Sequence, residues 1–159
     1  SKDYPFTTSR DTSAAAFVSE AGLSPLDVDE VIMVIRAFPI RVPGNSGPLP
    51  NETDWKNVSA IAGQESLVEY TSVTKSVRRV AHFDPEVVVS AIAANNPTHI
   101  VMNHLDYIDA ECSKGGIISQ KARKFLHCVE QSINRQITHI GFDRKSIHEN
   151  VRLQNIKIA

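Results

Sequence analysis

The chain has 159 residues, of which 42% are hydrophobic and 22% are charged, and its formal net charge is -1. This length is enough for a hydrophobic core, and we expect residues 1–159 to form a single domain. The balanced charge gives no attraction to nucleic acid or to an anionic membrane, and the sequence shows neither an apolar run of about 18 residues nor a signal peptide. We therefore expect a cytoplasmic protein without nucleic-acid or membrane partners, in which Cys112 and Cys128 stay reduced.

The first predicted elements are a short helix and a buried strand. Asp11 or Thr12 can cap a helix over residues 13–21, which Gly22 can end in the left-handed conformation. The run 31–35 is short, apolar and rich in β-branched residues. This pattern is typical of a strand covered on both faces.

A segment rich in proline and glycine, residues 42–51, follows that strand. In a compact domain such an irregular segment is more often a binding loop than a simple connection. Thr53 or Asp54 can cap the next helix, whose Trp55 we place in the core. Beyond it, residues 68–83 contain a dense cluster of hydroxyl and guanidinium groups.

Helices and strands continue to alternate in the second half of the chain. Asp84 caps a helix with Pro85 at its first position, and an apolar strand follows at 98–102. Ser119 caps a longer helix, and 136–140 is the last predicted strand. This alternation predicts an α/β fold, a mainly parallel sheet with flanking helices and with binding loops at the strand ends.

The tetrapeptide 103–106 directly follows the strand at 98–102 and has the sequence Asn-His-Leu-Asp. The carboxylate of Asp106 can accept hydrogen bonds from the N1–H and the 2-amino group of guanine, while the amide of Asn103 reaches another edge of the base. The order is that of the guanine-binding motif Asn-Lys-x-Asp, with His104 in place of lysine. Ligands of open α/β sheets bind at this end of the strands. On four residues alone, however, an ordinary turn explains the pattern better.

Other constellations favour ordinary structural roles. The six histidines lack the short spacing of a metal site, so we expect no metal ligand in this chain. Ser119, His127 and Asp143 could form a triad on paper, but no nucleophile elbow is present and Ser119 suits a helix cap. We expect no catalytic residue in this chain.

Six blocks of this sequence, taken together, resemble the pattern of a known protein family. They are 4–10 with 12, 36–42, 47–52, 78–79 with 83–84, 104–106 with 109, and 141–144. Their order and spacing resemble the carboxyl-terminal half of the adenylosuccinate synthetase family. The resemblance implies a GTP-dependent ligase of purine (AMP) biosynthesis, a homodimer with a larger P-loop-type fold, which joins L-aspartate to the 6-position of IMP through a 6-phosphoryl intermediate.

The resemblance also implies roles for individual residues. Substrate-binding residues would be Thr8 at the IMP phosphate, Arg41 and Val42 at the ribose, and Thr74, Lys75 and Arg78 in the loop that binds aspartate. GTP-binding residues would be Asn103, His104, Asp106 and Gly141. An imidazole at position 104 can stack on the base as the lysine stem would, and the glycine at 141 would allow close approach of the backbone to guanine.

One loop departs from the family pattern. The family usually has Thr-Gly-Arg-x-Arg-Arg where this chain has Thr-Lys-Ser-Val-Arg-Arg at 74–79. Glycine has become Lys75 and the first arginine has become Ser76. Lys75 can supply the missing positive charge, and the loss of the arginine affects the contact that aspartate shares with the nucleotide ribose.

In the family, the phosphate loop, the Mg-binding and general-base aspartate and the general-acid histidine lie in the amino-terminal half. We therefore expect this chain alone to be inactive and to hold neither GTP nor Mg by itself, and we name the amino-terminal half as its partner. One alternative is a 2-aminoadenylosuccinate synthetase-like enzyme that acts on a guanine nucleotide. Another is a non-catalytic purine-nucleotide-binding module.

Overall fold

The main sheet of the protein has four strands. The computed structural model describes residues 6, 12–114, 118–143 and 146–150. The strands, in spatial order, are β1 (Ile32–Arg36), β5 (His99–Asn103), β6 (His139–Gly141) and β7 (Ile147–Glu149). β1, β5 and β6 are parallel, and β7 pairs antiparallel with β6. The predicted α/β class with a mainly parallel sheet is therefore confirmed, although β7 was not predicted and β6 begins later than expected.

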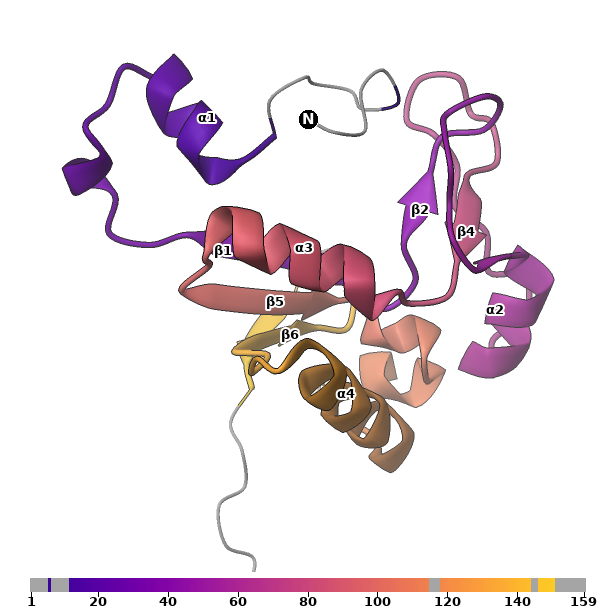
Figure 1. Ribbon diagram of the computed structural model, residues 1–159. Coiled ribbons are helices and arrows are strands. Elements are labelled where there is room, and N and C mark those ends of the chain that lie inside the picture. Colours follow the sequence, from indigo (N-terminus) through magenta and orange to yellow (C-terminus); the bar gives the residue numbers. More distant parts are fainter. Residues whose placement is uncertain (1–5, 7–11, 115–117, 144–145, 151–159) are drawn as a thin grey trace, which may run out of the picture.

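The two longest helices pack into one common core with the sheet. They are α3 (Pro85–Asn95), beside β1 and β5, and α4 (Gln120–Ile133), near β6 (Figure 1). Val88 of α3 and Leu126 of α4 share the hydrophobic core with Ile100 and Met102 of β5. Both helices begin as predicted, with Asp84 accepting from the Glu86 amide at 3.0 Å and Ser119 from the Ala122 amide at 3.2 Å.

β1 is covered on one face only in the described part of the chain. Met33 and Ile35 pack against the core, whereas Ile32 and Val34 are 57% and 58% exposed. Our expectation of a strand covered on both faces is therefore wrong for these residues. The reason is that the core, with α3 and α4, takes only every second side chain of the strand.

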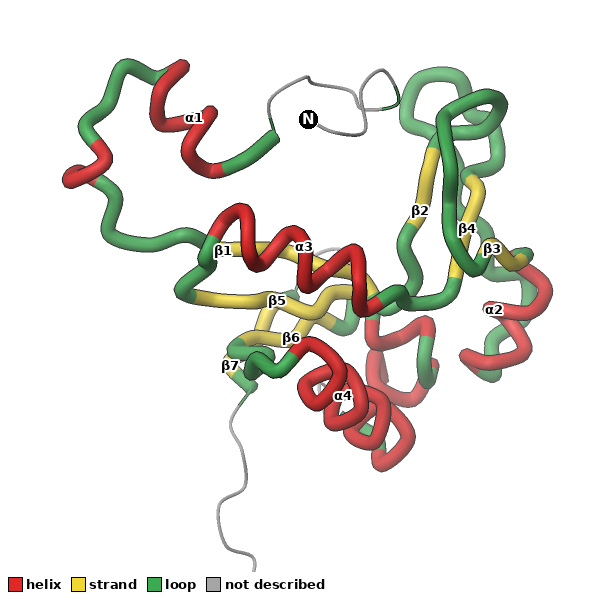
Figure 2. Tube along the Cα trace, viewed as in Figure 1, coloured by secondary structure: helices red, strands yellow, loops and turns green. Residues whose placement is uncertain are grey.

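A second, antiparallel sheet lies beside the first (Figure 2). Its strands are β2 (Ile40–Arg41), β4 (Arg79–Ala81) and β3 (Glu52–Thr53), in that spatial order. We did not predict it, because strands of two or three residues are too short to show an alternating pattern. Residues 42–51, between β2 and β3, are irregular as predicted.

The remaining helices begin close to the predicted positions. α1 (Ala14–Glu20) is capped by Ser13 rather than by Asp11 or Thr12, and Gly22 follows it with a φ of 67°. Asp54 caps α2 (Trp55–Ala62), and Trp55 is buried as predicted.

Three short 3-10 helices complete the described structure, at Pro25–Asp27, Leu105–Tyr107 and Ala110–Lys114. Cys112 and Cys128 are both free. Within the described ranges no helix has the length and apolar character needed to span a membrane.

Leu105 anchors the segment that follows β5, because its side chain is fully buried in the core. We predict that Leu105→Ala lowers the free energy of unfolding by about 2–5 kcal/mol, through lost contacts and the cavity left behind. Leu26, which is 93% exposed, provides a matched control. Leu26→Ala should change the free energy of unfolding by less than about 0.5 kcal/mol. Chemical denaturation measures both values, and equal effects would show that Leu105 is no anchor.

Candidate functional site

The carboxyl ends of β1 and β5 lie side by side. Arg36 and Asn103 are register partners in the parallel pairing, and the amide of Ala37 donates to the carbonyl of Asn103 at 3.2 Å. Side chains that follow the two strands therefore gather at one edge of the sheet, where ligands of α/β folds bind. The residues that follow β5 make the 103–106 turn.

The 103–106 turn is held in a strained conformation by its own side chains. The Oδ1 atom of Asn103 accepts the amide hydrogen of His104 at 2.9 Å. His104 has φ 60° and ψ 50°, in the left-handed region. A residue with a Cβ rarely adopts this conformation unless its surroundings impose it, and the next residue, Leu105, is buried in the core.

His104 and Asp106 carry buried polar atoms that lack a hydrogen-bond partner. His104 Nδ1 lies 3.5 Å from Asp106 Oδ1, and neither atom forms a hydrogen bond in the part of the chain that the structure describes. The same holds for Arg36 Nε. Since buried polar atoms are nearly always paired in folded proteins, this edge of the sheet can accept a ligand that pairs with them.

The ring of His104 already has an aromatic neighbour. It packs against the ring of Tyr107 with a centroid distance of 4.7 Å and an interplanar angle of 36°, and His104 is only 6% exposed. One face of the imidazole is therefore occupied. Stacking of His104 on a nucleotide base stays a prediction, and it is limited to the part of the ring that Tyr107 leaves open.

Gly141, at the end of β6, lies against the same turn. A Cβ at this position would come within 2.3 Å of Asn103 Oδ1 and 3.1 Å of the Ser146 carbonyl oxygen. The side chain of Asn103 thus gives a physical reason for glycine here that does not involve a base. The predicted approach of this glycine to guanine remains a prediction.

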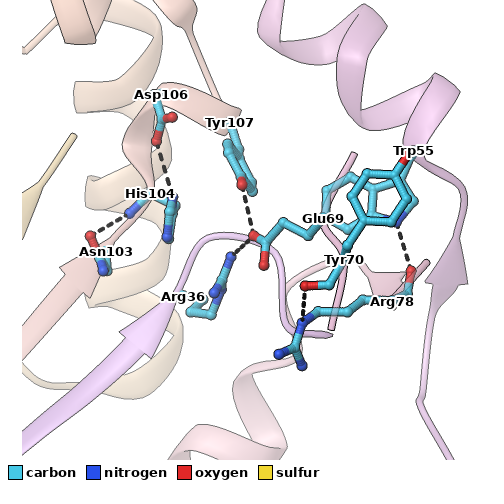
Figure 3. A network of polar contacts seen from close by, with 9 residues as sticks. All are labelled: Arg36, Trp55, Glu69, Tyr70, Arg78, Asn103, His104, Asp106 and Tyr107. Carbon is cyan, nitrogen blue, oxygen red and sulfur yellow. Dashed lines mark hydrogen bonds and ion pairs between the residues drawn. The ribbon is translucent and has the colours of Figure 1, made fainter. Parts of the chain in front are cut away.

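A buried carboxylate, that of Glu69, lies next to Tyr107, the residue that follows the turn (Figure 3). Its Oε1 atom accepts from the Tyr107 hydroxyl at 2.7 Å and forms an ion pair with Arg36. Burial and the hydrogen bond to Glu69 raise the pKa of Tyr107, so this phenol remains protonated and donates. We did not foresee these three residues from the sequence, because positions so far apart give no local signal.

The hydroxyl-rich segment predicted at 68–83 contains a closed loop. The Thr71 amide donates to the Ser76 carbonyl at 2.9 Å, and the Ser76 amide donates to Thr71 Oγ1 at 3.0 Å. Thr71 Oγ1 lies 2.6 Å from Thr74 Oγ1. Lys75 at the tip has a φ of 53°, a conformation that suits glycine. Lysine therefore keeps the backbone shape that the family's glycine would favour.

Arg78 ends this 71–78 loop, and its backbone is held on both sides. Its amide donates to the Glu69 carbonyl at 2.9 Å, and its carbonyl accepts from Trp55 Nε1 at 2.7 Å. The guanidinium Nε donates to the Tyr70 carbonyl at 3.3 Å. A rigid backbone thus presents a half-buried guanidinium, the group that binds carboxylates in bidentate fashion.

Arg41 joins two segments instead of extending freely into solvent. Its guanidinium donates to the Pro48 carbonyl at 3.2 Å and to the carbonyl of Phe6. It also lines a cleft of about 700 Å³ between β1, α3 and residues 39–50, whose other polar wall residues are Arg36 and Asp84. Val42 is 44% exposed, next to this wall.

The structure thus places the predicted site residues in three groups. Asn103, His104, Asp106 and Gly141 meet at the end of the main sheet, and Thr74, Lys75 and Arg78 belong to the 71–78 loop. Arg41 lines the cleft, and Val42 follows it in the chain. Thr8 lies outside the described residues. Within the described ranges no three His, Cys, Asp or Glu side chains are grouped so as to hold a metal ion.

Removing the strain at the tip of the 71–78 loop should stabilise the protein. A left-handed residue with a Cβ costs about 1–2 kcal/mol, and glycine costs about 0.5–1 kcal/mol in lost chain entropy, so Lys75→Gly should raise the free energy of unfolding by about 0.5–1 kcal/mol. Lys124→Gly is the control, because it removes the same charge from helix α4. It should lower the free energy of unfolding by about 1 kcal/mol. Parallel thermal melts measure both, and destabilisation by Lys75→Gly would contradict the strain argument.

Comparisons with known proteins agree on one family. The sequence model of the family described as adenylosuccinate synthetase matches residues 1–114. The adenylosuccinate synthetase of Methanocaldococcus jannaschii is 35% identical over 155 residues, which are 96% of this chain and 43% of that enzyme. The Methanococcus aeolicus enzyme is 37% identical over 133 residues, 82% of this chain and 38% of its own length. The chain thus spans about two fifths of the relatives it matches.

Two solved structures have a similar fold. The succinoaminodeoxyadenylate synthetase of cyanophage S-2L, bound to dGMP and to dATP as an energy donor, is 28% identical with a TM-score of 0.69. The match covers 92% of this chain and 41% of that one. The fully ligated adenylosuccinate synthetase of Plasmodium falciparum matches with a TM-score of 0.74 over 94% of this chain and 46% of its own, and at 17% identity this likeness concerns the fold alone.

Proposed function

Since this chain belongs to the adenylosuccinate synthetase family, we propose that it supplies the base-binding and amino-acid-binding part of a GTP-dependent ligase of purine biosynthesis. The longer enzyme would join L-aspartate to IMP and form adenylosuccinate. The observation that most supports this is the pair His104 and Asp106 at the carboxyl end of β5, whose buried Nδ1 and Oδ1 atoms face each other at 3.5 Å and form no hydrogen bond in the described ranges. A ligand that offers hydrogen-bond donors would satisfy the carboxylate.

The donor and acceptor groups of the 103–106 turn complement guanine. Asp106 can accept from both the N1–H and the 2-amino group of this base. Asn103 uses its Oδ1 atom within the turn, which leaves its amino group to donate to an acceptor such as the purine N7. Adenine would instead turn its N1 acceptor toward the carboxylate, which is repulsive. The turn therefore favours a guanine nucleotide as energy donor.

The amino-acid substrate would bind at the 71–78 loop. Arg78 can pair with a carboxylate of L-aspartate, Thr74 can donate a hydroxyl hydrogen bond, and Lys75 adds a second cation at the tip. The IMP ribose would border Arg41 and Val42, with Thr8 at the phosphate. These assignments follow the family pattern on the residues of this chain.

The remainder of the enzyme would complete the site. Ile32 and Val34 leave one face of β1 bare, whereas a parallel sheet is normally covered on both faces. We place the amino-terminal half of the enzyme there, with the phosphate loop and the Mg ligands. In this proposal the 159-residue chain alone has no turnover, and the full-length enzyme is a cytoplasmic homodimer.

The acceptor nucleotide is the part of the proposal that has a second candidate. The phage neighbour was bound to dGMP and dATP, and it is 28% identical to this chain. A sister enzyme that joins aspartate to a guanine nucleotide would keep the same fold and chemistry. The mismatch of adenine with Asp106 argues against dATP as energy donor here, and the first candidate is therefore the enzyme that uses GTP.

An assay of the full-length enzyme with L-aspartate and Mg²⁺ tests the two candidates. We expect product from IMP with GTP, at a rate at least about tenfold above that from dGMP with dATP, which corresponds to one unmade polar pairing at the base. The reverse preference would establish the sister activity. Nucleotide binding without any product would instead support a non-catalytic module.

The base preference can be changed at a single atom. Asp106→Asn presents an amide that mismatches the two donors of guanine but can donate to the 2-oxo group of xanthine. The variant of the full-length enzyme should lose about tenfold or more in kcat/KM for GTP and gain for XTP, because an unpaired buried polar group costs about 1–3 kcal/mol. A parallel thermal melt must show an unchanged transition. If GTP stays preferred over XTP, Asp106 does not bind the base.

A further inference from the structure

Glu69 lies between the 103–106 turn and the 71–78 loop (Figure 3). Its side chain points to Arg36 and Tyr107, and its Oε1 atom contacts both of them. Its backbone carbonyl accepts the amide hydrogen of Arg78 at 2.9 Å. A single residue thus contacts one candidate site through its side chain and the other through its backbone.

Tyr107 is the link from Glu69 to the base-binding turn. Its amide donates to the His104 carbonyl at 3.2 Å, and its ring packs 4.7 Å from the imidazole of His104. A displacement of His104 therefore has to move Tyr107, and with it the hydroxyl that Glu69 accepts.

The two groups that hold Arg78 both contact Tyr107. Trp55 Nε1 donates to the Arg78 carbonyl at 2.7 Å, and the Trp55 ring meets the Tyr107 ring edge-on at 6.1 Å. Glu69 holds the Arg78 amide and bonds the Tyr107 hydroxyl. The position of Arg78 is thus fixed from both sides by residues packed on one tyrosine.

The carboxylate of Glu69 is costly where it lies. Glu69 is 9% exposed, and a buried ion pair is often no more stable than an apolar replacement of the same size. Overall stability therefore gives little reason for a charge at this position. Its strong hydrogen bonds do fix the relative position of the segments that it joins.

We propose that Glu69 is a positioning residue that couples the 103–106 turn to the 71–78 loop, so that a base bound at the turn orders Arg78 for the amino-acid substrate. Coupling between two sites is reciprocal, so the amino acid also strengthens binding of the nucleotide. The identity of the two ligands rests on the function proposed above, whereas the mechanical link between the two segments does not.

Hydrogen exchange of the ligand-free, full-length enzyme tests the link itself. Tyr107→Phe removes only the hydroxyl and keeps the ring between His104 and Trp55, and Glu69→Gln removes the charge. In each variant the exchange of the Arg78 and Thr71 amides should become about tenfold faster or more, since a hydrogen bond to a charged group has been lost. Tyr70→Phe is the matched control, because this tyrosine directly precedes the 71–78 loop and is 55% exposed; its effect should be below about twofold.

Binding measurements on the same proteins test the coupling. In the unmodified enzyme saturating L-aspartate should lower the Kd for GTP by about fivefold or more. In Tyr107→Phe the ratio of the Kd for GTP without L-aspartate to the Kd with L-aspartate should fall toward one. In Tyr70→Phe this ratio should stay as in the unmodified enzyme. If Tyr107 only stabilised the fold, its replacement would change the Kd for GTP with and without L-aspartate by the same factor and leave their ratio unchanged.

The two measurements separate the possible failures. Unchanged exchange of the loop amides in both variants would overturn the link, and so would an unchanged aspartate effect on GTP binding. Faster exchange in an enzyme that binds no GTP at all would support the link but overturn the function proposed for the turn. Faster exchange of the loop amides, together with loss of the effect of L-aspartate on GTP binding, would support both the link and the proposed function of the turn.

Discussion

The candidate site depends on the parallel pairing of β1 with β5. This pairing aligns Arg36 with Asn103, two residues that are distant in sequence, and ends both strands at the same edge of the sheet. Because the strands are parallel, the segments that follow them leave in the same direction and share one space. The 103–106 turn, Arg36 and, through Glu69, the 71–78 loop all take their places from this alignment.

Polar groups at this edge fall into two sets, one without hydrogen bonds in the described ranges and one that is hydrogen-bonded. His104 Nδ1, Asp106 Oδ1 and Arg36 Nε are buried without hydrogen bonds in the described ranges, while the neighbouring Glu69 carboxylate and Tyr107 hydroxyl are paired with each other. Tyr107, whose hydroxyl is paired, packs against the ring of His104, whose Nδ1 atom forms no hydrogen bond. In the proposed function, this arrangement would hold the base-binding groups in a fixed geometry before a ligand arrives, which reduces the entropy lost on binding.

The bare face of β1 fits a chain that spans about two fifths of the length of its relatives. Ile32 and Val34 are apolar and more than half exposed, whereas their neighbours Met33 and Ile35 pack against the core. In the proposed function, the amino-terminal half of the enzyme packs on this bare face, which would account for the near-continuous apolar sequence of the strand. The short antiparallel sheet of β2, β3 and β4 places the 42–51 and 71–78 loops beside the main sheet without extending it.

Elements with local sequence signals could be predicted before the structure was known. Asp84, Ser119 and Asp54 cap the helices as predicted, the apolar runs form β1 and β5, and the order of the short motifs identified the family. Contacts between side chains that are distant in sequence became visible only in the folded protein. The contact of Glu69 with Tyr107, the need for glycine at 141 beside Asn103 and the left-handed backbone of Lys75 were not visible in the sequence. Helix caps and apolar runs act over a few residues along the chain, whereas these contacts join distant positions whose approach is set by the packing of the whole core.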